Sequence, residues 1–218
     1  ILFDMLRPFI ETNYTQDDKE LLIDLCRKVV FNNSTQGCLI KGEKYNWKGL
    51  PRNKSLFHSG LGIGLPIGNL TSQVFANFYM DAFDHFVKHN LGLKYYGRYV
   101  DDFVLVHPSK AYLTKLMPLL SRFLQDELGL KIHPKKIYLQ HYTKGVKFVG
   151  AVLKPNRIYI ANRTKGNMYD AISKFNTIAR TQKIQAHNVD ALLCSMNSYL
   201  GIMKHYKTYK IRRVMTKK

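Results

Sequence analysis

Two adjacent acidic residues, Asp101 and Asp102, lie between two apolar runs and are the side chains best suited to chemistry. Aromatic and β-branched residues dominate residues 93–100 and 103–106, which predicts a β-hairpin with the two acids at its tip. Neighbouring carboxylates repel each other unless a divalent cation neutralises them, and Mg²⁺ prefers oxygen ligands that it shares with substrate phosphates. The pair therefore predicts metal-assisted phosphoryl or nucleotidyl transfer, with a plain polar turn as the alternative for an isolated Asp-Asp.

Further motifs surround this pair in a fixed order. They are GLPIGNLTSQ at residues 64–73, ANFYM at 76–80, YVDD at 99–102, LGLKIHPKK at 128–136 and VKFVG at 146–150. Their order and spacing resemble the sequence blocks of the reverse transcriptase family over roughly residues 1–155. The resemblance implies an RNA-directed DNA polymerase that copies an RNA template into cDNA by nucleotidyl transfer.

The detail of the first motif points to a subfamily. Most members carry Gln after the Pro and end the block with Ser-Pro, whereas this chain has Ile67 and Ser72-Gln73. That variant resembles the reverse transcriptases of diversity-generating retroelements, which make errors at template adenines during mutagenic retrohoming. A group II intron or retron-type reverse transcriptase is one alternative, and a non-catalytic RNA-binding module derived from a polymerase is another.

The resemblance also implies roles for individual residues. Asp101 and Asp102 would hold two Mg²⁺ ions, or Mn²⁺, with Asp101 as the main bridging ligand. The nucleotide and template would contact Ile67, Gly68, Gln73, Tyr99 and Lys136, and the primer grip would include Phe148 and Gly150. Lys136 has a plain surface lysine as its alternative. The implied partners are template RNA, the cDNA primer duplex, a dNTP and a basic accessory protein.

Composition supports a nucleic-acid partner independently of the motifs. The chain has 218 residues and a formal net charge of +19, while 45% hydrophobic residues suffice for a folded core. No apolar run reaches the ~18 residues that span a bilayer, so we expect no membrane partner. Three scattered cysteines, Cys26, Cys38 and Cys194, fit reduced thiols in a cytoplasmic protein, which the resemblance would place in a bacterium or phage. His85 and His89 have i, i+4 spacing, for which a solvated helix face is the expected role.

The elements that must position these motifs alternate between helices and strands. We expect helices over residues 1–10, over 16–31 with Thr15 as N-cap, from Asn69 or Thr71 to 90, and after Ser109 to about 128. The expected inward residues are Leu21, Leu22, Leu25 and Val29 in the second helix, and Val74, Phe75, Phe78 and Phe86 in the third. The composition of residues 32–64 predicts loops with short strands. Five basic residues in this segment either contact phosphates or only keep the loop solvated: Lys41, Lys44, Lys48, Arg52 and Lys54.

Strands are expected near residues 137–140 and 146–153. This order predicts an α+β fold, an antiparallel sheet with helices on one face, which the resemblance identifies as a partial palm over residues 1–156. A strand at 157–160 and helices at about 163–182 and 188–206, joined by residues 185–188, would form a helical thumb over residues 157–218.

The thumb region holds thirteen Lys and Arg residues against two acids, a net charge of +11. Cations interleaved with rings suit contacts to sugar and phosphate. The expected contacts are Lys204, Lys207, Tyr209, Lys210, Arg212 and Arg213, whereas Tyr199 is expected in the thumb core.

The family's palm also needs a third carboxylate, on a strand just before a Phe-Phe-x-Ser-Ile type segment. Residues 1–6 resemble the helix that follows that strand, and Asp4 does not occupy the missing position. The expectation is a fragment that lacks the fingers and the first palm motif, binds metal weakly and is inactive alone.

Overall fold

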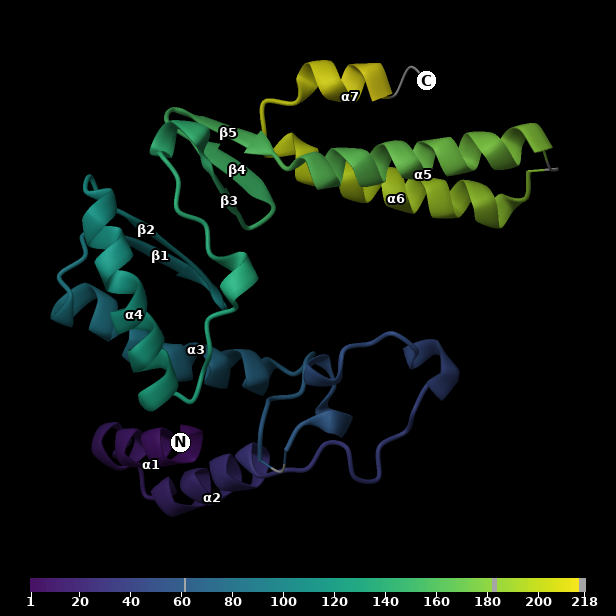
Figure 1. Cartoon of the computed structure of the whole chain (residues 1–218). Helices are drawn as coiled ribbons and strands as arrows, with labels where there is room; N and C mark the ends of the chain where they lie inside the picture. Colours follow the sequence, from purple (N-terminus) through teal and green to yellow (C-terminus); the bar gives the residue numbers. More distant parts are fainter. Residues whose placement is uncertain (61, 182–183, 216–218) are drawn as a thin grey trace. The chain divides into compact units, whose positions relative to one another are not determined.

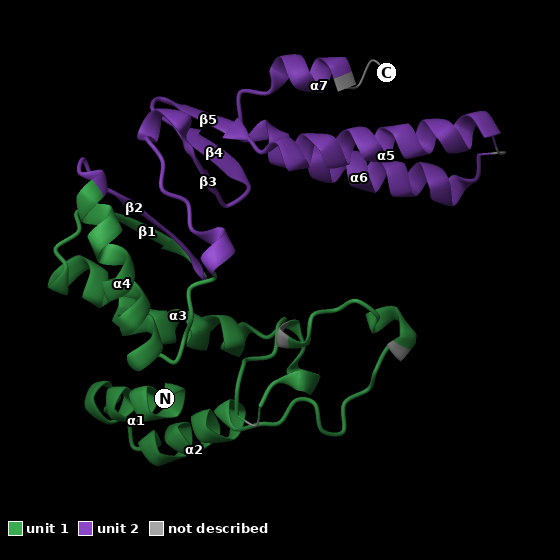
Figure 2. Cartoon of the chain, in the orientation of Figure 1, with its two compact units in different colours: residues 1–100, 111–133 green, residues 101–110, 134–218 purple. Residues whose placement is uncertain are grey.

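The computed structural model describes residues 1–60, 62–181 and 184–215, which form two compact units (Figures 1 and 2). The first unit contains Ile1–Val100 and Ala111–His133, and the second contains Asp101–Lys110 and the chain from Pro134 onward. Helices and small antiparallel sheets occur together, so the chain is of the α+β class. The division into a palm and a thumb at residue 156 is a functional assignment and stays a prediction.

Helices make up most of the first unit. Their bounds are α1 Leu2–Asn13, α2 Lys19–Val30, α3 Leu70–His85 and α4 Lys110–Asp126. Leu116, Leu120 and Leu124 recur every four residues and are buried, which gives α4 the apolar stripe that a core-facing helix needs. Phe123 of α4 stacks on Phe86 with the ring centroids 4.1 Å apart. Aromatic packing therefore joins α4 to the end of α3.

The start and the buried face of α2 differ from the prediction. The N-cap is Asp18 rather than Thr15, and Ile23 is the buried residue of the helix. The expected inward residues are wrong in part, because three of them are about half exposed: Leu21, Leu25 and Val29. Ile23 lies about 200° around the helix from Leu21. Apolar residues occur on both sides of α2, so periodicity alone does not choose the buried side.

The long connection between α2 and α3 contains three short 3₁₀ turns, Lys44–Trp47, Arg52–Lys54 and Leu56–His58. The short strands expected there do not occur among the described residues, so that prediction is wrong. Isolated i→i+3 turns suit a segment rich in Gly and Asn, which favour turns over extended pairing.

Helix α3 begins at Leu70, directly after Asn69, and continues into a π-helical turn over Phe86–Asn90. Both ends agree with the prediction. Phe75 is buried as expected, but Val74 is 56% exposed, which contradicts its expected inward position. The fully buried residues are Phe83 and Val87, one turn apart, where α3 passes into the π turn.

The acidic pair lies on a hairpin, as the sequence predicted. Strand β1 covers Tyr95–Tyr99, strand β2 covers Asp102–Val106, and the two form a two-stranded sheet. Side chains alternate between the two faces of a strand, so Tyr96 and Arg98 share one face of β1. Phe83 of α3 meets the Tyr96 ring edge-on, with centroids 6.3 Å apart. Helix α3 therefore covers the face of β1 that carries Arg98.

The second unit contains a three-stranded antiparallel sheet of β3 Val146–Phe148, β4 Ala151–Lys154 and β5 Arg157–Ile160. Phe148 pairs with Ala151, so only Val149 and Gly150 connect β3 to β4. Both have the positive φ that a type I′ turn requires, +48° and +75°. This turn divides the single strand that was expected over residues 146–153.

Two other strand predictions need correction. Residues 137–140 form no strand, because they find no partner strand among the described residues. The single expected sheet is also wrong, since the structure has two separate small sheets.

Helices α5 Asn162–Thr181 and α6 Ala186–Lys204 pack on each other and are followed by α7 Tyr209–Met215. Met168 and Met203 are fully buried with Ile160, and Tyr199 packs against them, which confirms its expected core position. A capping box starts α6, because Gln185 and Asn188 bond each other's backbone amides. The predicted connection at 185–188 is therefore too long. None of the helices in the described part of the chain combines the length and the apolar character needed to cross a bilayer.

Two glycines near the β3–β4 hairpin have positive φ, but only one of them is also close to another backbone segment. A Cβ at Gly145 (φ +79°) would lie 2.6 Å from the Leu153 carbonyl oxygen, whereas a Cβ at Gly150 (φ +75°) meets nothing within 4 Å. We predict that Gly150→Ala lowers the free energy of unfolding by about 1–2 kcal/mol, from backbone strain alone. Gly145→Ala should lower it by about 2–4 kcal/mol, because a backbone atom must also move. Urea denaturation of both variants measures the difference, and equal losses would contradict the close approach at Gly145.

Candidate active site

Asp101 and Asp102 occupy the tip of the β1–β2 hairpin. Asp101 is in the turn, Asp102 is the first residue of β2, and both are exposed. Among the residues that the structure describes, neither carboxylate forms an ion pair with a basic side chain. Their oxygens are therefore available to an external ligand.

A hydrogen-bonded network on α3 holds β1 just before this tip. Arg98 donates from Nε to Asp84 Oδ1 at 2.8 Å and from Nη2 to Asp84 Oδ2 at 2.6 Å. The hydroxyl of Tyr96 also donates to Asp84 Oδ1. The third nitrogen of Arg98, Nη1, donates to the Val100 carbonyl oxygen at 2.8 Å and to Asn77 Oδ1 at 3.4 Å. One guanidinium thus connects α3, β1 and the turn.

The charges in this network are mutually stabilised. Burial alone would raise the pKa of the Asp84 carboxyl, but hydrogen bonds from Arg98 and Tyr96 outweigh it and lower that pKa below its usual value. The bond to Asp84 raises the pKa of Arg98, and burial together with the same carboxylate raises the pKa of Tyr96. Only 10% of the Arg98 side chain and 26% of the Asp84 side chain are exposed. The pair is more shielded from water than a surface salt bridge.

The turn itself is strained at Val100. This residue has φ +56°, a region that β-branched side chains avoid. Such a conformation costs roughly 1–3 kcal/mol and persists only where the surroundings enforce it. The Arg98 bond to the Val100 carbonyl is one such constraint.

A groove of ≈ 390 Å³ opens beside the network and is lined by Asp81, Asp84, His85, Lys88, His89, Tyr96, Gly97 and Arg98. His85 and His89 lie with their ring centroids 5.2 Å apart, and His85 pairs with Asp81 at 3.2 Å. No group of three or more His, Cys, Asp or Glu side chains suited to a metal occurs in the described part of the chain.

The residues expected near the nucleotide lie partly in the first unit. Ile67 and Gly68 directly precede α3, and Gln73 is in its first turn. Ile67 is completely exposed, at 101%, and Gly68 has φ +109°. Tyr99 ends β1 and is 57% exposed on the face opposite Arg98. The local fold therefore brings Ile67, Gly68 and Gln73 together at the start of α3.

The other expected contacts lie in the second unit. Lys136 is exposed in a 3₁₀ turn, Phe148 is half-buried on β3, and Gly150 is in the β3–β4 turn. Among the predicted thumb contacts, Arg212 is half-buried, whereas five are exposed: Lys204, Lys207, Tyr209, Lys210 and Arg213. Their binding roles stay predictions.

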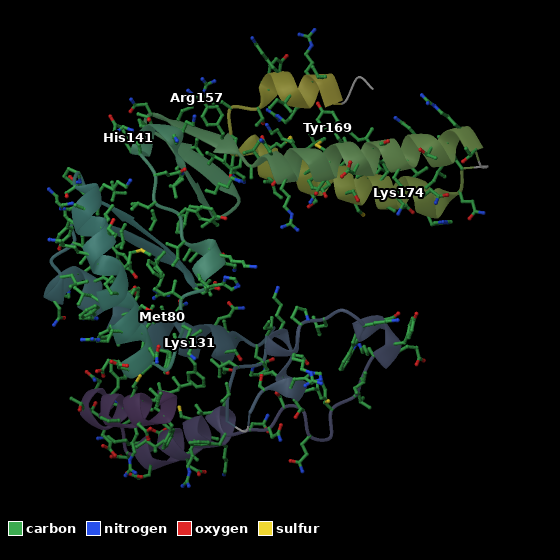
Figure 3. The ribbon with its side chains drawn as sticks, in the orientation of Figure 1. Met80, Lys131, His141, Arg157, Tyr169 and Lys174 are labelled. Carbon is green, nitrogen blue, oxygen red and sulfur yellow. The ribbon has the colours of Figure 1, made fainter. Side chains whose placement is uncertain are left out.

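An additional cationic cluster lies on the second sheet. Lys154 and Arg157 flank the Tyr159 ring, with Arg157 Cζ 4.9 Å and Lys154 Nζ 5.9 Å from its centroid. In Figure 3, Arg157 lies on the sheet and Lys174 on α5, so exposed basic side chains occur on both elements of this unit.

The sequence prediction missed Asp84, Tyr96 and Arg98. The sequence did contain a signal for Arg98, because it is the one charged residue in an otherwise uncharged strand of Tyr and Gly residues, 95–99. Such a residue needs a partner when its strand face is covered. The identity of that partner depends on the packing of α3 and is not visible in the strand.

The tip residues fit a divalent cation of the Mg²⁺ type. Mg²⁺ is commonly bound by one or two carboxylates, with water and substrate phosphates as its other ligands. Asp101 and Asp102 supply two exposed carboxylates without a competing ion pair among the described residues.

Comparison with protein-family models gives one relevant finding. Residues 24–153 match the model described as reverse transcriptase (RNA-dependent DNA polymerase). The match spans more than half of the chain and includes α3, the β1–β2 hairpin, α4 and β3. A comparison with curated proteins gives no significant match.

The Asp84 network predicts a pH-dependent contribution to stability. Because the folded-state pKa of Asp84 is lowered, its contribution is present above the unfolded pKa of about 3.9 and is lost as the pH falls through the folded value. We predict that Asp84→Asn lowers the free energy of unfolding at pH 7 by about 1–2 kcal/mol, allowing for partial exposure. The difference should shrink below about pH 4.

Urea denaturation of both proteins across this pH range measures the effect. Asp81→Asn is the matched control, because Asp81 lies one turn away on α3 and its side chain is 61% exposed. A constant difference between the wild-type protein and Asp84→Asn at every pH would contradict the prediction.

Proposed function

This chain belongs to the reverse transcriptase family, and on that basis we propose that it forms the part of a polymerase in which nucleotidyl transfer takes place at Asp101 and Asp102. The observation that carries the proposal is the exposed acidic pair at the tip of the β1–β2 hairpin, inside the matched residues 24–153. Members of this family are RNA-directed DNA polymerases that generally use divalent metals and bind template nucleic acid and dNTPs.

In the proposed mechanism, Asp101 and Asp102 would hold a pair of Mg²⁺ ions, with Asp101 as the main ligand. When bound, the metal ions would supply activation of the primer hydroxyl and charge stabilisation of the pyrophosphate. The hairpin turn presents Asp101 and Asp102 together, and the absence of an ion pair to either residue in the described structure keeps their negative charge available. Lys136, exposed in its turn, supplies a positive charge toward the triphosphate.

The remaining elements are proposed to hold the nucleic acid. Phe148 and the Val149-Gly150 turn contact the primer strand, and α5, α6 and α7 form the basic thumb against the duplex. The support for the thumb is its net charge of +11 over residues 157–218, together with the exposed side chains of Lys204, Lys207, Lys210 and Arg213. Phosphate contacts of this kind position a duplex without reading its sequence.

We predict that Asp101→Asn lowers primer extension on an RNA template by more than about 100-fold, since even residues that only support a metal ligand have effects up to that size. RNA affinity should stay close to that of the wild-type protein, because the phosphate contacts lie elsewhere. The measurement is primer extension and filter binding with the substitution placed in a full-length polymerase chain. Asp126→Asn, an exposed acid at the end of α4, is the matched control. Extension by Asp101→Asn at the wild-type rate would reject the proposed site.

The finer proposal is a reverse transcriptase of the diversity-generating type. Its support is Ile67, where most relatives carry Gln, and the side chain is fully exposed before α3. An amide at this position could hydrogen-bond the template–nucleotide pair, whereas Ile67 offers only contact and volume. A less restrained pair tolerates mismatches best at template adenine, where correct pairing has two hydrogen bonds rather than three.

We therefore predict that Ile67→Gln lowers misincorporation opposite adenine by about fivefold, the worth of one added hydrogen bond, and opposite guanine by less. Sequencing of cDNA made from one defined template by both proteins measures the change. Leu39→Gln replaces a 95% exposed apolar residue outside the motif and should leave the error spectrum unchanged. An unaltered adenine error rate in Ile67→Gln would argue against the subfamily.

A further inference from the structure

Arg98 connects Asp84 on α3 with Val100, the residue before Asp101. Two of its nitrogens bind the two oxygens of Asp84, at 2.8 and 2.6 Å. The remaining nitrogen, Nη1, binds the Val100 carbonyl oxygen at 2.8 Å. The guanidinium is therefore fixed on α3 by one edge and restrains the turn by the other.

The Val100 carbonyl has a direct geometric relation to Asp101. The carbonyl of Val100 and the amide nitrogen of Asp101 belong to one planar peptide group. Holding the carbonyl oxygen therefore fixes the plane that contains the Asp101 Cα, from which the Asp101 side chain departs. Val100 has φ +56°, a region that β-branched residues rarely occupy.

We propose that Arg98, oriented by Asp84, is a positioning residue that sets the direction of the Asp101 carboxylate for metal binding. This inference rests on the proposed function, because it assumes that Asp101 is a metal ligand. Arg98 does not touch the metal or the substrate in this role. It acts through the backbone of Val100.

The guanidinium group is specifically suited to the task. Its donors form a rigid planar fork, so two can hold a carboxylate while another binds a carbonyl. A lysine in the same place has the same charge but one nitrogen, and its flexible stem cannot maintain the three bonds in this geometry. Arg98→Lys therefore keeps an ion pair to Asp84 and removes the restraint on the turn.

The competing explanation is a clamp that only holds β1 on α3. Tyr96→Phe separates the two explanations, because it removes the third hydrogen bond to Asp84 and leaves the Arg98 contact with Val100 intact. A clamp would lose stability in both variants without a change in metal affinity. A positioning residue would alter metal affinity in Arg98→Lys alone.

The experiment is a titration of Mn²⁺ by electron paramagnetic resonance into the intact protein, bound to a primer–template without a 3′-hydroxyl and a dNTP. We expect Arg98→Lys to weaken Mn²⁺ affinity about tenfold, the lower end of the range for residues that support metal ligands, and Tyr96→Phe to change it less than about twofold. Asp84→Asn should match Arg98→Lys, and the double variant should also lose about tenfold rather than a hundredfold, since both act through one contact. Melting temperatures recorded on the same samples report stability separately.

Each outcome decides the proposal. If the wild-type protein binds Mn²⁺ and Arg98→Lys binds it equally well, the positioning role is wrong while the proposed function stands. The same conclusion follows if Tyr96→Phe weakens binding as much as Arg98→Lys. If Asp101→Asn binds Mn²⁺ as tightly as the wild-type protein, the metal site of the proposed function is wrong, and the positioning role is rejected with it.

Discussion

The ion pair between Asp84 and Arg98 is the interaction on which the candidate site depends. A two-stranded hairpin is marginally stable in water by itself, so β1 and β2 need packing from another element. Helix α3 supplies it for β1, through the edge contact of Phe83 with Tyr96 and the two bonds from Arg98 to Asp84. The charged pair is largely shielded, and removing one partner would leave the other charge uncompensated beside the fully buried Phe83. A polar contact within the first unit therefore holds β1 up to the residue that precedes the acidic pair.

Local patterns predicted the elements better than their packing. The hairpin, the starts of α3 and α4 and the strand β5 follow from short-range signals, namely aromatic and β-branched runs, Asn69 and Ser109. The buried side of α2 did not follow, because apolar residues occur on both of its sides. The strand expected at residues 137–140 failed for a related reason, since a strand needs a partner that only the tertiary fold provides. Asp84 and Arg98 are fourteen residues apart, on elements of different type, so no periodicity relates them.

The β1–β2 and β3–β4 hairpins share a backbone feature. Val100 and Val149 both have positive φ, at +56° and +48°, although turn positions of this kind favour Gly and Asn. Each valine lies at the tip of a hairpin that carries a motif of the family, YVDD or VKFVG. Turn preferences do not predict β-branched residues at these positions, so the sequence alone did not reveal the positive φ angles of the two valines. Strained backbone of this type concentrates at functional sites, where the surrounding structure enforces it.

The short separation between the partners of the Asp84 network also bears on how the chain folds. Tyr96 is twelve residues and Arg98 fourteen residues from Asp84, and closing a loop of that size involves a small loss of chain entropy. Contacts of low sequence separation form early in folding, ahead of pairings between distant segments. The π turn at Phe86–Asn90 lies within this loop, and Phe123 of α4, on which Phe86 stacks, is also made before the basic helices. The hairpin that carries the acidic pair can thus assemble on α3 during synthesis, before the ribosome has made the basic helices that follow.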